Sequence, residues 1–266
     1  MKHTQRATLV LLLAFSAISH ADLMLSGHST ASAFNMPSSS QEQIWISNTQ
    51  VRRDFTDRGR AYTHLFDLSK KQVVVIDHFT RMVEIHNLST LDSTTQASAE
   101  TDALKFKLAP TGNTSMLQSW VCKEHDLSAS VQAMLGSEAT VLNLKGKIWL
   151  ASDVPEQAEV KGLVGAAKTA DFFLTIPALA QVAPAYSQVM NEIFRKIAPK
   201  GLPCAGEMSA SYEGNGPMAN LARKLPTKAG VRFQQFSSAP IKPEMFAIPA
   251  GYRLMQKPLP AMGLQK

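Results

Sequence analysis

The chain has 266 residues, of which 45% are apolar and 18% are charged, a composition typical of a globular protein with a sizeable core. Its formal net charge is +6, but its lysines and arginines form no dense run, so the sequence argues against a nucleic-acid-binding protein. After residue 21 no segment approaches about 18 uninterrupted apolar residues, the length expected of a membrane-spanning helix.

The first 21 residues have the pattern of an export signal. Basic residues begin the segment, 7–18 is mostly apolar, and Ser19-His20-Ala21 places small residues where a signal peptidase requires them. We therefore predict a signal peptide over 1–21, cleaved after Ala21. No internal repeat or linker divides the rest, which predicts a single domain over 22–266. The expected location is the periplasm of a Gram-negative cell.

Cys122 and Cys204 are the only cysteines in the sequence. An oxidising compartment favours a disulfide between them. Closing a loop of roughly 80 residues would stabilise the fold by about 4 kcal/mol. Two buried free thiols are the alternative, because the sequence does not show whether the two backbone positions lie close enough to be bridged.

Short strands dominate the first part of the mature chain. Alternating or β-branched runs separated by turn residues predict an antiparallel meander of about five strands, at 43–47, 50–55, 61–66, 72–76 and 81–86. Residues 88–101 are rich in serine and threonine and predict a loop or a short helix. Further strands are expected at 104–108, 117–124, 138–144, 147–151, 203–211 and 231–237.

The longest helical pattern is Thr175–Lys200, and the stretch 156–171 before it also looks helical. Apolar residues recur in Thr175–Lys200 at steps of three and four, which places them on one face of a helix. Pro184 lies inside the segment and predicts a kink or a break. A long amphipathic helix among many strands must bury its apolar face on a sheet, so the sequence predicts an α+β fold.

Four motifs follow one another along the mature chain. They are the strand-turn-strand unit 61–85, Trp120-Val121-Cys122, the strand and proline at Ile148–Pro155, and the ending Glu244–Tyr252. On these motifs, residues 22–256 resemble the secreted bacterial proteins grouped as domain-of-unknown-function family 4412. That family in turn resembles the periplasmic lipoprotein-carrier (LolA/LolB-like) fold. The resemblance implies a strongly curved antiparallel sheet, a half-barrel, wrapped around or covered by the long kinked helix, with an apolar cavity between them.

No pattern of residues points to catalysis. The sequence has no Gly-x-Ser-x-Gly motif, no Ser-x-x-Lys set in a convincing context and no glycine-rich phosphate loop, so we predict neither an enzyme nor a cofactor. Glu84 and His86 lie on one side of a strand, and His64 and His78 could approach them. Because the usual ligand spacings are absent, we interpret these as solvent-facing residues and predict no metal site.

Large apolar side chains are the remaining candidates for recognition. A pocket between sheet and helix would be lined by such groups, and the candidates are Trp45, Trp120, Trp149, Phe172, Leu179, Tyr186 and Phe194. Each of them could equally fill a packed core. Arg52 and Arg53 belong to a loose basic cluster with Arg58 and Arg60, and are candidates for contact with an anionic lipid headgroup. A solvated surface is the alternative for this cluster.

Two functions are compatible with the sequence. The first is a non-enzymatic periplasmic binding or carrier protein for a hydrophobic ligand, such as an acyl chain or a lipoprotein. The second is a structural or protein-interaction module of the cell envelope with a fully packed core. The volume between helix and sheet distinguishes them.

Overall fold

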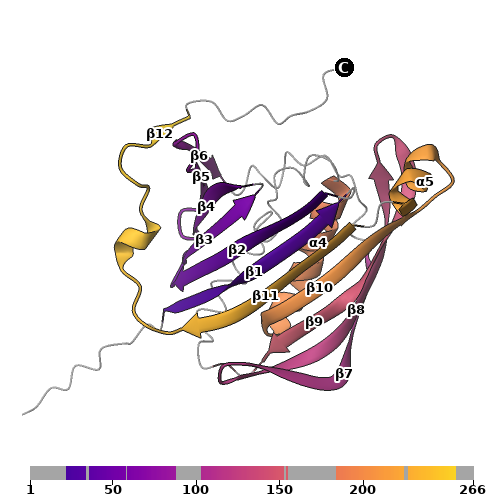
Figure 1. Cartoon of the computed structure of the whole chain (residues 1–266), viewed down its shortest axis with the longest axis horizontal. Helices are drawn as coiled ribbons and strands as arrows, with labels where there is room; N and C mark the ends of the chain where they lie inside the picture. Colours follow the sequence, from indigo (N-terminus) through magenta and orange to yellow (C-terminus); the bar gives the residue numbers. More distant parts are fainter. Residues whose placement is uncertain are drawn as a thin grey trace, which may run out of the picture.

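The computed structural model describes residues 22–33, 36–57, 59–87, 103–152, 154, 184–224 and 227–255. The predicted signal peptide lies outside them. One sheet of 12 strands dominates the described part, in the order β12-β6-β5-β4-β3-β2-β1-β11-β10-β9-β8-β7 (Figure 1). The strands are β1 (Leu23–Ala33), β2 (Met36–Ser47), β3 (Gln50–Asp57), β4 (Arg60–Asp67), β5 (Gln72–Asp77), β6 (Met82–Asn87), β7 (Lys105–Leu117), β8 (Trp120–Leu135), β9 (Glu138–Ala151), β10 (Leu202–Glu213), β11 (Thr227–Ser237) and β12 (Arg253–Leu254).

Neighbouring strands run antiparallel, except that β12 pairs with β6 in parallel. Strands β2 to β6 are consecutive hairpins, which confirms the predicted antiparallel meander. The later strands are longer than predicted. The segments 138–144 and 147–151, predicted as two strands, form one continuous strand β9 that includes Gly146. A β-carbon at this position would lie 2.0 Å from the carbonyl oxygen of Glu207, so glycine allows β10 to approach closely.

The predicted α+β fold with a long kinked helix is wrong. The described residues form mainly strands, with two short α-helices, α4 (Pro184–Ile197) and α5 (Pro217–Lys224), and two short 3₁₀ segments, η2 (Ala198–Lys200) and η3 (Pro243–Phe246). Pro184 is the first residue of α4, and no proline lies inside the helix as described. The first turn of a helix has no partner for its N–H groups, so a residue without an N–H is tolerated there. The rest of the predicted helix, 175–183, and the stretch 156–171 lie outside the described residues.

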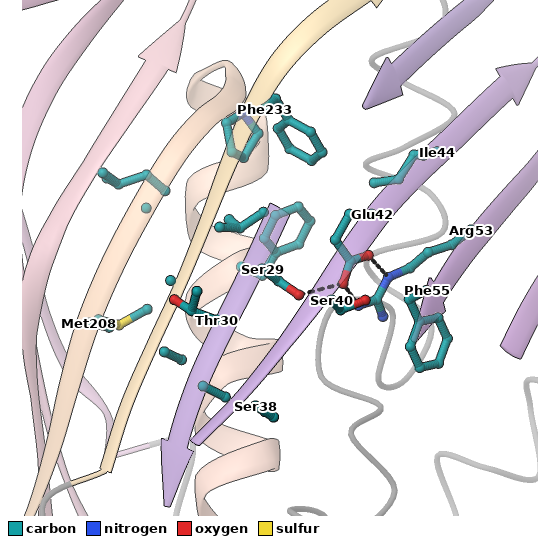
Figure 2. Close-up of a pocket in the computed structure, with 18 of the residues that line it drawn as sticks. Ser29, Thr30, Ser38, Ser40, Glu42, Ile44, Arg53, Phe55, Met208 and Phe233 are labelled. Carbon is teal, nitrogen blue, oxygen red and sulfur yellow. Dashed lines mark hydrogen bonds and ion pairs between the residues drawn. The ribbon is translucent and has the colours of Figure 1, made fainter. Parts of the chain in front are cut away.

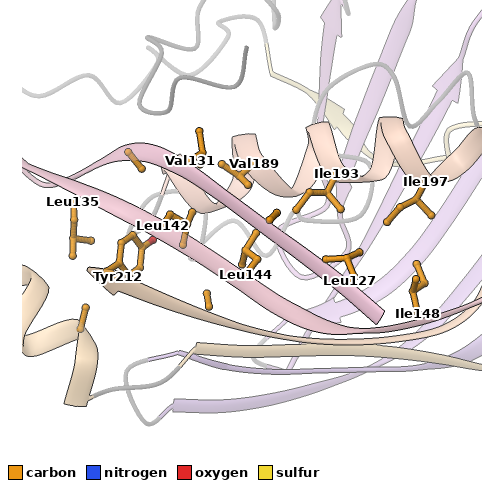
Figure 3. Packing of buried hydrophobic residues seen from close by; sticks show 14 of the residues in the cluster. Leu127, Val131, Leu135, Leu142, Leu144, Ile148, Val189, Ile193, Ile197 and Tyr212 are labelled. Carbon is orange, nitrogen blue, oxygen red and sulfur yellow. The ribbon is translucent and has the colours of Figure 1, made fainter. Parts of the chain in front are cut away.

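Helix α4 packs on one face of the sheet, which we call the inner face; it lies behind the central strands in Figure 1. Val189, Ile193 and Ile197 lie on one side of α4 and are buried against β8, β9 and β10 (Figure 3). For these three residues, this first core cluster agrees with the apolar stripe predicted from the periodicity of the helix. Neither helix in the described part of the chain is long and apolar enough to cross a membrane.

A second core cluster fills the inner face of β1 to β5. It contains Leu23, Leu25, Ile44, Ile46, Val51, Phe66 and Val73, with Phe233 from β11. The beginnings of β8 and β10 also contribute to it, through Trp120, Cys122, Leu202 and Cys204. The two clusters therefore lie along one continuous sheet.

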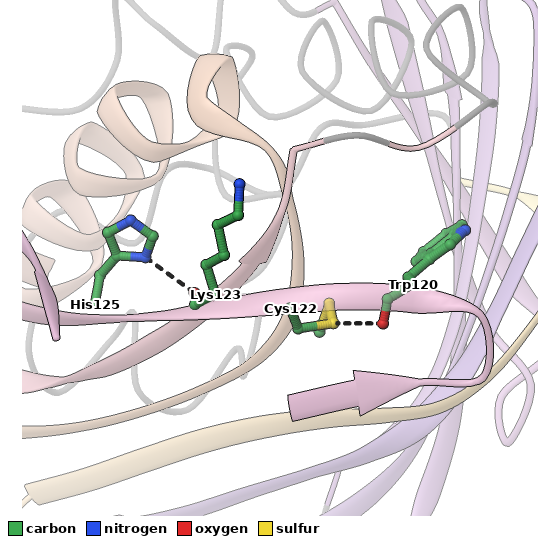
Figure 4. The surroundings of a disulfide bond; sticks show 5 residues. Trp120, Cys122, Lys123 and His125 are labelled. Carbon is green, nitrogen blue, oxygen red and sulfur yellow. Dashed lines mark hydrogen bonds between the residues drawn. A yellow bond between two sulfur atoms is a disulfide. The ribbon is translucent and has the colours of Figure 1, made fainter. Parts of the chain in front are cut away.

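The predicted disulfide between Cys122 and Cys204 is confirmed, with a Cα–Cα distance of 6.3 Å (Figure 4). It links β8 to β10 across the intervening strand β9. Strands two positions apart in a flat sheet are separated by about 9.6 Å, so the sheet bends sharply here. A register shift between Pro203 and Ala205 leaves Cys204 out of the pairing with β9 and marks a β-bulge. The Cys122 sulfur also lies 3.8 Å from the Trp120 carbonyl oxygen, in van der Waals contact, because a bonded sulfur has no proton to donate.

The C-terminal segment, 238–255, crosses the outer face of the meander. Arg52 Nη1 donates a hydrogen bond of 2.7 Å to the Met245 carbonyl oxygen. The Tyr252 hydroxyl lies 2.7 Å from His78 Nδ1, and His78 Nε2 lies 2.8 Å from the Thr63 hydroxyl. The Thr63 hydroxyl in turn donates to Asp54 at 2.6 Å. This chain of hydrogen bonds fastens the ending to the sheet.

Candidate functional site

A cavity of about 140 Å³ lies between the inner face of the central strands and α4. Its walls differ in chemistry. The side chains that α4, β9, β10 and β11 contribute are apolar, and include Ile193, Phe194, Met208, Val231 and Phe233. The polar residues that line it come from β1, β2 and β3 and are Ser29, Thr30, Ser38, Ser40, Glu42, Arg53 and Thr56. The cavity is thus mostly apolar, and its polar groups are confined to the side of β1, β2 and β3, where Ala31, Ile44 and Phe55 also line it.

A buried ion pair forms the centre of the polar wall (Figure 2). Arg53 Nε donates to Glu42 Oε2 at 2.9 Å, and Arg53 Nη2 donates to Glu42 Oε1 at 3.0 Å. The Ser29 hydroxyl donates a third hydrogen bond to Glu42 Oε1, at 2.7 Å. Both charged residues are only 4% exposed. A bidentate pair with a further donor is the arrangement that makes buried charges tolerable.

The aromatic neighbours of Arg53 hold it against the sheet. Its guanidinium lies 4.4 Å from the centroid of the Phe55 ring, a cation–π distance. His64, on the next strand, contacts the edge of Phe55 at a centroid distance of 4.9 Å. Burial lowers the pKa of His64 to about 3, with smaller contributions from the charges of Arg53 and His86. His64 is therefore neutral at physiological pH, and Arg53 is the cation of this wall.

The aromatic residues proposed to line an apolar pocket lie in different parts of the structure. Phe194 lines the cavity. Trp120 is buried and stacks on Phe236 at a centroid distance of 3.8 Å, near the disulfide. Trp45 lies beneath Arg52 and Trp149 beneath Arg232, at 5.3 and 5.7 Å from the ring centroids, and neither lines the cavity.

Three candidate lining residues cannot be placed. Phe172 and Leu179 lie outside the described residues, and the side chain of Tyr186 is also outside what the structure describes. Of the candidates, the structure thus places Phe194 in the cavity wall and Trp45, Trp120 and Trp149 outside it.

The two candidate headgroup residues have different environments. Arg53 is buried in the cavity wall, so it is not part of a basic surface cluster. Arg52 forms an ion pair with Asp54 at 2.8 Å and donates a hydrogen bond to the carbonyl oxygen of Met245 in the C-terminal segment. Arg60 stacks on Phe79 at 4.9 Å. The loose basic cluster is therefore separated by the alternation of the strands, with Arg52 and Arg53 on opposite faces.

The four residues considered as metal ligands do not converge on one point. His86 lies 3.1 Å from Glu84, and His78 bonds to Thr63 and Tyr252. His64 is buried and enclosed by aromatic rings, so its interpretation as a solvent-facing residue is wrong. Within the described residues, no group of three or more His, Cys, Asp or Glu side chains is placed to hold a metal ion.

Glu42 was missed as a functional candidate, although its strand contains a signal. Glu42, Ile44 and Ile46 alternate along β2, so the carboxylate lies in the apolar register of the strand. Arg53 stands between Val51 and Phe55 in the same way. A charged residue in a buried register needs a partner. That partner becomes identifiable only when β2 and β3 are aligned, with Ile44 opposite Arg53.

Comparisons with known proteins identify no relative. No protein-family model matches the chain, and no curated protein matches it. Among solved structures, it is similar to the chain of "Structure of PNGF-II in C2 space group", with a TM-score of 0.35 and 8% sequence identity. This similarity covers 89% of our chain and 31% of that one, so our chain spans about a third of its length. Similarity at this level supports no inference, and the resemblance to family 4412 remains a prediction.

Proposed function

We propose that this protein is a non-enzymatic, exported binding protein that holds the apolar end of a small amphiphilic molecule in the cavity between the sheet and α4. The observation that carries the proposal is the division of the cavity walls. Apolar side chains from α4 and β9–β11 would contact the hydrocarbon, whereas Ser29, Glu42 and Arg53 would face its polar part. Such a combination is usual for small-molecule sites.

The volume of the cavity limits the size of the ligand that it could hold. A buried apolar cavity of about 150 Å³ accepts benzene in another protein, so 140 Å³ suits a ring or the end of one acyl chain. It does not favour a ligand with several complete acyl chains, such as the lipid of a lipoprotein. We therefore prefer a ligand with one hydrocarbon segment and a neutral or cationic polar group near Glu42.

Titration of the purified full chain with 1-octanol tests the proposal. We expect saturable binding by calorimetry, and a loss of at least about tenfold in affinity for Ala229→Phe, because the new ring would occupy the cavity. The matched control is Gln234→Phe, which adds the same ring at an exposed position of the same strand. Equal binding by both variants, or no binding by the wild type, would refute the proposal.

Native mass spectrometry of the chain purified from the cells that produce it provides a second test. A reproducible small-molecule adduct that Ala229→Phe lacks and Gln234→Phe retains would support the proposal. If no adduct is found but a protein partner is recovered in stoichiometric amount, the envelope interaction module is the better description.

A further inference from the structure

The outer face of the sheet carries a row of lysines that the proposed function does not use. Following the strand pairing from β7 to β1, the residues opposite one another are Lys107, Ser128, Lys145, Ser209, Lys228 and Ser32. Lysine and serine therefore alternate across six neighbouring strands. We call this the lysine–serine row.

The row faces away from α4. Ser128 lies between the buried residues Leu127 and Ala129, and Lys145 follows the buried Leu144, so alternation directs both to the opposite face. All three lysines of the row are exposed. Among the residues that the structure describes, none of the three forms an ion pair with a carboxylate.

Two neighbouring rows on this face, the lysine–serine row and the row next to it, contain lysines but no acidic residue. The neighbouring row, one pair of residues further along the strands, contains Lys105, Ser130, Asn143 and Ser211. The two rows together hold four lysines and no acidic residue. Acidic side chains enter in the rows on either side. Lys147 lies opposite both Asp126 and Glu207 in one of them, and Glu213 lies opposite Val141 in the other.

A groove lies on part of the row. It has a volume of about 830 Å³, and its lining includes Ser32, Lys145, Ser209 and Lys228, with the acidic Glu207 at its edge in the neighbouring row. The two lysines flank Ser209, whose hydroxyl donates to the Lys145 carbonyl oxygen at 3.2 Å. Both ammonium groups can therefore reach an anionic group placed above Ser209, and the same arrangement of residues repeats over Ser128.

We infer that this groove binds a linear polysaccharide in which acidic and neutral sugars alternate. Lysines on alternate strands are about 9.6 Å apart, with a hydroxyl between them. An acidic sugar at each lysine and a neutral sugar at each serine would match both the charge and the hydrogen-bonding capacity of the row. The lysines and serines of the row belong to the face opposite the cavity, although residues such as Ala31, Met208 and Ala229 line both the groove and the cavity.

The shape of the sheet favours a chain over a flat anionic surface. Neighbouring strands rotate by about 20–25°, so the direction of the side chains turns by about 90° over the four steps from Lys107 to Lys228. A bilayer could meet only part of the row, whereas a flexible polymer can follow it. A single-stranded nucleic acid is disfavoured, because neither lysine row contains an aromatic side chain on which bases would stack.

Binding to immobilised hyaluronate, in which an acidic and a neutral sugar alternate, tests the inference with the full chain. The wild type should bind at low salt, and more weakly as salt is raised, because the contacts are ionic. The double variant Lys145→Gln/Lys228→Gln should bind about tenfold or more weakly, since each lysine at an anionic surface contributes about a factor of five. Ser209→Glu should weaken binding similarly, by placing a carboxylate between the two lysines.

The control variant Lys200→Gln/Lys242→Gln removes the same charge at two exposed lysines outside the row, and its affinity should change less than about twofold. An equal loss in both double variants would show that only net charge matters and would overturn the inference. So would absence of binding by the wild type. Tighter binding to anionic vesicles or to single-stranded DNA, with the same dependence on Lys145 and Lys228, would overturn the choice of partner.

Discussion

The Arg53–Glu42 pair is the residue-level feature on which the cavity depends. Removing one partner of a buried pair costs more than the pair itself contributes, because the other charge keeps its desolvation cost. We expect Glu42→Gln to lower the free energy of unfolding by about 3 kcal/mol, measured by urea denaturation.

An apolar replacement of the whole cluster should behave differently. In Ser29→Ala/Glu42→Leu/Arg53→Met no buried polar group loses a partner within the cluster, so stability should return to within about 1 kcal/mol of the wild type. If this variant is as unstable as Glu42→Gln, the stabilising role lies in the pair itself. If both variants are as stable as the wild type, the pair is not buried in solution.

His64 gives the stability of the protein a pH dependence whose sign can be derived. Its pKa is about 3 in the folded protein and 6.5 in the unfolded reference, so below pH 6.5 the unfolded chain binds a proton that the folded chain does not. Stability must therefore fall as pH falls from 6.5 towards 3. Between pH 7 and pH 5 the loss should be about 2 kcal/mol.

The variant His64→Phe should lack this part of the pH dependence, since it places an uncharged ring between Phe55 and Phe66. The measurement is urea denaturation of both proteins at several values of pH. His28→Gln, at an exposed position of β1, serves as the control and should follow the wild type. Parallel stability curves for the wild type and His64→Phe would contradict the prediction.

At the scale of elements, α4 shows what periodicity can and cannot predict. The spacing of Val189, Ile193 and Ile197 correctly predicted the face that packs on the sheet. It could not fix where the helix begins, because a proline inside a helix and a proline in its first turn are identical in a sequence. In α4, Pro184 is the first residue, where a missing N–H is tolerated, and residues 175–183 lie outside the described residues.

Alternation along the strands predicted the meander but not the cavity. A strand pattern assigns each residue to a face, yet the contents of a site depend on which residues of different strands lie side by side. Glu42 and Arg53 are 11 residues apart in sequence and meet only through the register of β2 and β3. The lysine–serine row likewise requires the register of six strands, so no sequence pattern could show it.

The C-terminal segment is explained by contacts rather than by its own pattern. Its secondary structure is limited to η3 and the two-residue strand β12. Its position is set by hydrogen bonds to residues distant in sequence, from Arg52 to Met245 and between His78 and Tyr252. The sequence motif was visible, but its role in covering the outer face of the meander required the fold.

At the scale of the whole molecule, the disulfide stabilises the region where the second core cluster meets the ends of β8, β9 and β10. Cys122 and Cys204 are separated by 82 residues in sequence, and a crosslink that closes so long a loop restricts the unfolded chain strongly. We expect Cys122→Ala/Cys204→Ala to lower the free energy of unfolding by about 4 kcal/mol.

Two measurements separate this entropic effect from a local distortion. Urea denaturation should give a lower midpoint for the double variant and for the reduced wild type alike, with coincident transitions in tryptophan fluorescence and far-UV circular dichroism. Trp120 should report any local change, because it stacks on Phe236 beside the disulfide. If the fluorescence transition occurs at a lower urea concentration than the circular dichroism transition, the disulfide stabilises a local region that unfolds separately. In that case the sheet would not unfold as one cooperative unit.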